Sequence, residues 1–66
     1  MNPSDLDAEL RERLEMAGCY VKRRASGGGE IWFTPHLNRE FRLEMRINNV
    51  AAANAALRRA GMEDAF

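Results

Sequence analysis

Aromatic and cationic side chains alternate along the middle of this chain, where neighbouring segments can bring them onto one surface. Rings that stack on bases beside cations that contact phosphates are typical of surfaces that bind RNA. The middle segment also carries the surplus of positive charge, because residues 20–48 hold six basic and three acidic side chains. The candidate binding residues on this interpretation are Tyr20, Lys22, Arg23, Arg24, Trp32, Arg42 and Arg46.

The same composition fits two other roles. Tryptophan, tyrosine and arginine are the residues that dominate binding energy at protein interfaces. Trp32 and Tyr20 also suit a purely structural role, in which they pair across strands and stiffen a sheet. Residue types alone leave all three interpretations open.

Side chains for proton transfer or metal binding are scarce. The single histidine, His36, follows Pro35 in an expected connection, and we interpret it as a solvated turn residue. Cys19 is expected in the core, and one cysteine excludes both an internal disulfide framework and a cysteine-only zinc site. The run 27–29 of three glycines lacks the lysine and following helix of a phosphate-binding loop. We therefore assign no catalytic residue, no metal and no cofactor.

Length and charge narrow the class of protein. A chain of 66 residues is expected to form a single domain, residues 1–66, with a thin core. Ten basic side chains balance ten acidic ones, which argues against a strongly basic, histone-like protein. The balance is uneven along the chain, because residues 1–19 hold five acidic and two basic side chains.

Hydrophobic spacing predicts a helix, three strands and a second helix. Leu6, Leu10, Leu14 and Ala17 form an apolar stripe on a helix over about residues 5–17. Strands are expected over 19–24, 30–34 and 41–47. Asn49 is a good cap for a last helix ending before Gly61. The inward stripe of that helix is expected to comprise Val50, Ala53, Leu57 and Ala60, with Ala56 beside it.

Short connections favour an antiparallel meander with both helices on one face, an α+β two-layer sandwich of order α-β-β-β-α. Alternation then assigns each strand residue to a face. The expected inner face comprises Cys19, Val21, Ile31, Phe33, Phe41, Leu43, Met45 and Ile47. The expected open face comprises Tyr20, Lys22, Arg24, Trp32, Thr34, Arg42, Glu44 and Arg46. On this assignment, replacing Trp32 weakens partner binding more than folding.

No apolar stretch is long enough to span a membrane, and residues 1–5 do not begin a signal peptide. The expected location is therefore the cytoplasm, with no membrane partner.

Several local strings resemble the HicA family of small bacterial toxins, which are messenger-RNA interferases with a fold like the double-stranded-RNA-binding domain. Residues 10–19, LRERLEMAGC, are similar to that family's opening helix, and residues 21–24, VKRR, to its first strand. Residues 28–32, GGEIW, fall where the family has Gly-Ser-His-His and two apolar residues. Residues 57–62, LRRAGM, resemble the end of its closing helix, so the likeness covers about residues 6–66.

The resemblance fails at the catalytic position. The family's catalytic histidine falls at about Gly29 and a second histidine at about Glu30. Histidine is the side chain suited to move a proton near neutral pH, whereas glycine has no side chain and an exposed carboxylate is a weak base. We therefore expect little or no ribonuclease activity.

Two classes of function remain. The first is a HicA-like RNA-binding domain without strong nuclease activity, either a degenerate toxin or a regulator, whose partner is RNA or a cognate antitoxin-like protein. The second is a non-catalytic protein-interaction module, an inhibitor or adaptor from a mobile element, which binds through the open sheet face, with a homodimer as one such contact. A salt titration separates them, because RNA affinity falls steeply with salt.

Overall fold

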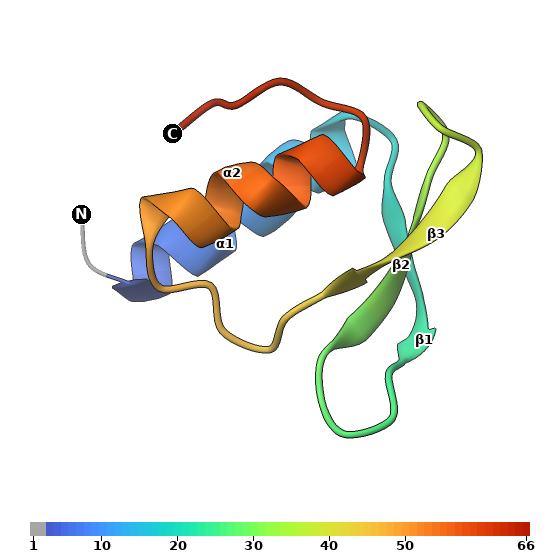
Figure 1. Ribbon diagram of the computed structural model, residues 1–66, viewed down its shortest axis with the longest axis horizontal. Coiled ribbons are helices and arrows are strands. Elements are labelled where there is room, and N and C mark those ends of the chain that lie inside the picture. Colours follow the sequence, from blue (N-terminus) through green and yellow to red (C-terminus); the bar gives the residue numbers. More distant parts are fainter. Residues whose placement is uncertain (1–2) are drawn as a thin grey trace.

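The computed structural model describes residues 3–66, with side chains from Asp5 onward, and contains the expected sequence of elements. Two helices flank three strands along the chain: α1 (Pro3–Met16), β1 (Tyr20–Arg24), β2 (Glu30–Thr34), β3 (Arg39–Leu43) and α2 (Val50–Arg59). The strands form one antiparallel sheet in the order β1-β2-β3. Figure 1 shows both helices on the same face of that sheet, running side by side in one direction. The predicted α+β two-layer arrangement is confirmed.

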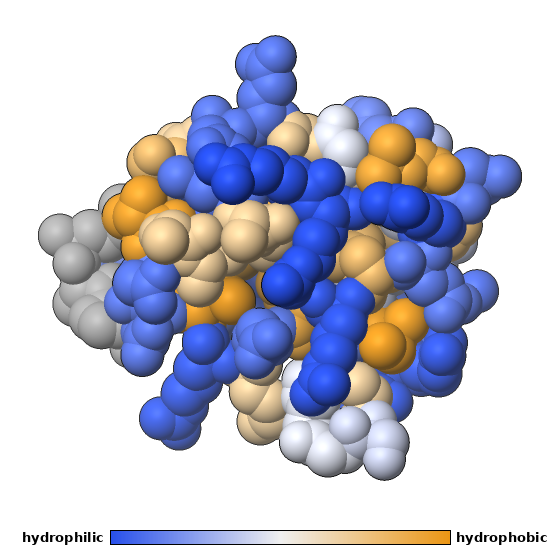
Figure 2. Space-filling model, viewed as in Figure 1, coloured by the Kyte–Doolittle hydropathy of each residue, from blue (hydrophilic) through white to orange (hydrophobic). Residues whose placement is uncertain are grey.

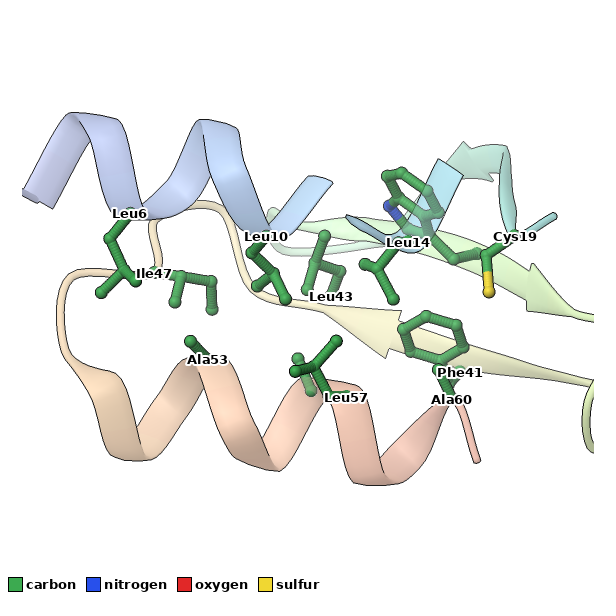
Figure 3. Packing of buried hydrophobic residues seen from close by; sticks show 12 residues of the cluster. Leu6, Leu10, Leu14, Cys19, Phe41, Leu43, Ile47, Ala53, Leu57 and Ala60 are labelled. Carbon is green, nitrogen blue, oxygen red and sulfur yellow. The ribbon is translucent and has the colours of Figure 1, made fainter. Parts of the chain in front are cut away.

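The core fills the space between the helices and the sheet. Leu6, Leu10 and Leu14 project from α1 toward α2 and β3, as Figure 3 shows. Helix α2 contributes Leu57 and several alanines, whose small side chains let the helix approach closely. All three leucines of α1 are buried, as the stripe predicted.

Both ends of α2 follow the sequence signals. The side chain of Asn49 accepts a hydrogen bond from the amide of Ala52 at 2.8 Å, which is the expected cap. Gly61 has a φ of 81° and ends the helix. The amide of Met62 then donates to the carbonyl of Leu57 at 2.8 Å, and Met62 packs against the core. Val50 is the exception in the predicted stripe, because it lies at the first turn and half of its surface is exposed.

The C-terminal tail returns along α2 (Figure 1). The amides of Ala65 and Phe66 donate to the side-chain oxygen of Asn54 at 3.2 and 3.1 Å. The ring of Phe66 packs against the core, and the guanidinium of Arg13 lies 5.2 Å from its centre. These contacts join the tail to both helices.

The predicted facing of β2 is wrong. Trp32 and Thr34 are buried toward the helices, with 1% and 0% of their surfaces exposed, whereas Ile31 and Phe33 lie on the open face. The reason is the register between β2 and β3, which pairs Trp32 with Phe41 and leaves a turn of four residues, 35–38. Since Phe41 faces the core, its partner Trp32 must do so as well.

A bulge in β1 changes the facing of its second half. The register with β2 shifts between Val21 and Arg23, so an extra residue is accommodated and alternation is interrupted. Arg23 consequently pairs with Ile31 and lies on the open face, whereas Arg24 pairs with Glu30 and does not. Val21 pairs with the inward-facing Trp32, so its predicted facing holds, but it lies at the edge of the sheet, is 45% exposed and does not join the core.

Strand β3 ends earlier than its alternating sequence predicted. Phe41 and Leu43 are buried as expected, but the strand stops at Leu43 and residues 44–49 form an extended connection to α2. Met45 is 60% exposed, so its predicted place in the core is wrong. Ile47 is still buried, because its amide donates to Asp7 of α1 at 3.2 Å and turns the connection back toward the helix.

Among residues 3–66, neither helix has the length and apolar character that a bilayer crossing requires.

Candidate nucleic-acid interface

The sheet face turned away from both helices combines two aromatic rings with cations. Cross-strand pairing places Tyr20, Phe33 and Glu40 in one row and Arg23, Ile31 and Arg42 in the next. Lys22 joins them at the bulge, because its ammonium reaches both the ring of Phe33 and the carboxylate of Glu40. We call this surface the open face, and it comprises Tyr20, Lys22, Arg23, Ile31, Phe33, Glu40 and Arg42.

Tyr20 and Phe33 form the aromatic part of the open face. Their ring centres are 5.4 Å apart and the rings are tilted by 38°, a normal geometry for an aromatic pair. Tyr20 is 52% exposed, whereas Phe33 is partly covered by Tyr20 and by Lys22, whose ammonium lies 5.9 Å from the ring centre. The exposed ring of Tyr20 is packed against the ring of Phe33, and an exposed ring of this kind can stack on a base.

The charges of the open face do not cancel. Lys22 and Arg23 share one carboxylate, that of Glu40, at 3.2 and 3.1 Å. These hydrogen bonds, first from Lys22 and then from Arg23, lower the pKa of Glu40 below its usual value. Arg42 adds a third cation and donates to the carbonyl of Gly28 at 3.0 Å. Three cations and one carboxylate leave the face positive.

The candidate residues predicted from the sequence are thus divided. The open face holds Tyr20, Lys22, Arg23 and Arg42. Trp32 lies in the core, and Arg24 lines a small hollow on the helix side, with Arg11, Glu30 and Met45 among its neighbours. Arg46 is exposed in the connection beyond the end of β3.

Phe33 takes the place that the sequence interpretation gave to Trp32. The three apolar residues 31–33 show no alternation, so their pattern carries no signal that separates the two faces. Only the length of the following turn, together with the alternation of β3, distinguishes them.

Glu30 is held in a network between α1 and the sheet. Its carboxylate accepts a hydrogen bond from Arg11 and another from the indole Nε1 of Trp32 at 3.2 Å. Arg11 also donates to Asp7 at 3.0 Å, one turn earlier on α1. The hydrogen bond from Arg11, assisted by that from Trp32, lowers the pKa of Glu30. A carboxylate held ionised in this way is poorly suited to exchange protons near neutral pH.

Gly29 has no room for a side chain. Its φ is +83°, and a Cβ atom built on it would lie 2.8 Å from the carbonyl oxygen of Leu43. A histidine at this position is therefore incompatible with the backbone as it stands.

The two other side chains considered for chemistry, His36 and Cys19, contact a backbone carbonyl and the hydrophobic core, respectively. His36 lies in the turn between β2 and β3, at the other end of β2 from Glu30, and its Nε2 is 3.1 Å from the carbonyl oxygen of Ala17. Cys19 is buried among core residues, as predicted. Within residues 3–66 no three histidine, cysteine or carboxylate side chains gather closely enough to hold a metal ion.

The Glu30 network makes stability depend on pH. Since the pKa of Glu30 is lower in the folded protein than in the unfolded chain, about 4.3, this stabilisation is complete above that value. It is lost as the pH falls through the folded pKa. We expect Glu30→Gln to lower the urea midpoint at pH 7, and the difference from the unmodified protein to shrink between about pH 5 and pH 3.

Urea unfolding at both pH values measures the effect. The carboxylates of Glu40 and Asp64, whose pKa values are also lowered by ion pairs, are present in both proteins and cancel in the comparison. A difference that stays constant with pH would contradict the assignment.

Comparison with known proteins adds no relative. No family model matches the chain, and neither the curated proteins nor the solved structures contain a match.

Proposed function

We propose that this chain is an RNA-binding domain that binds single-stranded RNA on the open face and does not cleave it. The observation that carries the proposal is the exposed Tyr20–Phe33 ring pair set among three cations. Rings reach bases only where bases are unstacked and unpaired, so single strands suit this flat surface better than a duplex.

The opposite side of the molecule is unsuited to nucleic acid. The outer surface of α1 has a broad hollow lined by Asp5, Glu9 and Glu12 beside Arg13 and Met16. Carboxylates there repel phosphates, whereas the open face attracts them. The open face is therefore more favourable for RNA than the outer surface of α1.

The proposed lack of cleavage follows from the turn between β1 and β2. The HicA resemblance would require a histidine near residue 29, where the backbone leaves no space, and Glu30 is held ionised by Arg11 and Trp32. The resemblance implies one of two roles, a degenerate toxin or a regulator in the cytoplasm. Each role is compatible with RNA binding that is not followed by RNA cleavage.

The test is fluorescence anisotropy with a labelled 12-nucleotide single-stranded RNA of mixed sequence. We expect Tyr20→Ala to weaken binding about 5- to 150-fold, equivalent to about 1–3 kcal/mol for one stacked base. Arg42→Gln should weaken it and lower the salt slope by about 0.7. The RNA should remain uncut after long incubation.

Met16→Ala is the matched control, because Met16 is a large exposed side chain, 81% accessible, on the acidic side of the molecule. It should leave the affinity unchanged. Absence of RNA binding by the unmodified protein at low salt would overturn the proposal. A Tyr20-dependent dimer or protein complex, insensitive to salt, would instead assign the open face to the protein-interaction class.

A further inference from the structure

Three arginines line a hollow at the outer edge of β3, next to the end of α2. Its volume is about 440 Å³, and its lining comprises Arg39, Glu40, Phe41, Arg42, Glu44 and Arg59. Since β3 is an edge strand, no further strand of the described chain covers this side. In Figure 2 strongly hydrophilic side chains cross this part of the surface, over the C-terminal part of α2 and over β3.

Two of these arginines come from segments that are far apart in the sequence, and their guanidinium groups have no carboxylate partner in the described part of the chain. Arg39 begins β3 and Arg59 ends α2, both are exposed, and neither forms an ion pair within residues 3–66. Arg58, the neighbour of Arg59 on the same helix, contrasts with them because its Nε donates to Asp64 at 2.7 Å. A guanidinium without a carboxylate partner gives up no ion pair when it takes up a phosphate.

The acidic side chains of the hollow are not equivalent. Glu40 is held by Lys22 and Arg23 on the open face. Glu44 has no ion pair in the described part of the chain and opposes an anion in the hollow. Its removal should therefore strengthen anion binding, a change of opposite sign to removal of an arginine.

The hollow continues the open face around the sheet edge. Arg42 belongs to both, because it pairs with Ile31 on the open face and lines the hollow. We propose, on the basis of the function proposed above, that this hollow binds a backbone phosphate of the RNA strand as it leaves the open face, with Arg39 and Arg59 as the contacting groups. The RNA thus bends over β3 toward α2, away from acidic α1.

Strand length separates the two parts of this surface. A 4-nucleotide RNA has enough length for the open face only, whereas a 12-nucleotide RNA extends past it. We expect Arg39→Gln and Arg59→Gln each to weaken binding of the 12-nucleotide RNA about fivefold at 100 mM salt, and to lower its salt slope by about 0.7, the value for one phosphate on a single strand. Binding of the 4-nucleotide RNA should not change, and Glu44→Gln should tighten binding of the longer RNA only.

Arg58→Gln is the matched control, since it removes the same charge one residue away and should have no effect on either RNA. Equal effects of Arg58→Gln and Arg59→Gln, or equal losses for the short and the long RNA, would overturn the hollow as a phosphate site. Tyr20→Ala should weaken binding of both RNAs. If it does so while Arg39→Gln and Arg59→Gln leave the affinity unchanged, this inference is overturned and the proposed function stands. Absence of RNA binding by the unmodified protein removes the proposed function with it.

Discussion

Replacing Trp32 with alanine is expected to remove a large part of the protein's free energy of unfolding at 25 °C. Trp32 is 1% exposed and is the largest fully buried side chain of the protein's described part. Truncation of a buried aromatic residue to alanine costs about 3–5 kcal/mol, while a domain of this size has a total stability of about 3–10 kcal/mol. The substitution also removes the indole hydrogen bond to Glu30. Urea unfolding followed by circular dichroism measures the loss.

Trp32→Phe and Tyr20→Ala are the comparison variants for this experiment. Phenylalanine retains much of the buried ring but not the hydrogen bond, so its effect should be smaller than that of alanine. Tyr20 is half exposed, and its removal should cost about 1 kcal/mol or less. Trp32→Ala with a normal urea midpoint and lost RNA binding would contradict the core position and restore the placement expected from the sequence.

The contrast between these two aromatic residues shows which features of the fold are determined by patterns in the sequence. The stripe of α1, the cap at Asn49 and the alternation of Phe41 and Leu43 predicted the helices and β3, because each is a local signal of hydrophobic spacing or hydrogen bonding. The short connections predicted the strand order and the layers. In β2, the three residues 31–33 are all apolar, and facing is set by pairing with β3.

The turn between β2 and β3 decides that pairing. Four residues separate Thr34 from its partner Arg39. When the number of residues in the turn is even, even-numbered residues of β2 pair with odd-numbered residues of β3, as Trp32 does with Phe41. An odd number would have given the predicted facing. The turn includes Asn38 with a φ of 52°, a conformation that asparagine tolerates, so the sequence held a weak signal of the turn geometry.

The candidate site was recovered in part for the same reason. Tyr20 and Arg42 lie where alternation is uninterrupted, and their open-face placement was predicted. Lys22 sits at the β1 bulge and still reaches the open face, as predicted. Arg24 changed face because of the β1 bulge, which follows from pairing with β2 and has no clear signature in β1 itself. Arg39 and Arg59 meet at one hollow only because α2 ends beside the edge of the sheet, a tertiary relation that spacing along the chain does not contain.

Substitution of Gly29 should have the second large effect on stability. A Cβ atom at this position meets the carbonyl oxygen of Leu43 at 2.8 Å, and the positive φ adds strain for any L residue. Strain of about 1–2 kcal/mol and a backbone displacement costing about 1–3 kcal/mol predict that Gly29→Ala destabilises the protein by about 2–5 kcal/mol. Gly29→His should be at least as damaging, because the larger side chain must enter the same space.

Gly27→Ala separates the two contributions, because Gly27 lies in the same turn with a φ of +81° but has no atom within 4 Å of a built Cβ. It should cost only the strain of about 1–2 kcal/mol. Urea midpoints of the three variants measure the difference, and equal losses for Gly27→Ala and Gly29→Ala would show that Leu43 does not exclude a side chain. The expected order implies that a histidine cannot be added at residue 29 without moving the end of β3. On the proposed function, the absence of cleavage then follows from the backbone at residue 29 and not only from a missing side chain.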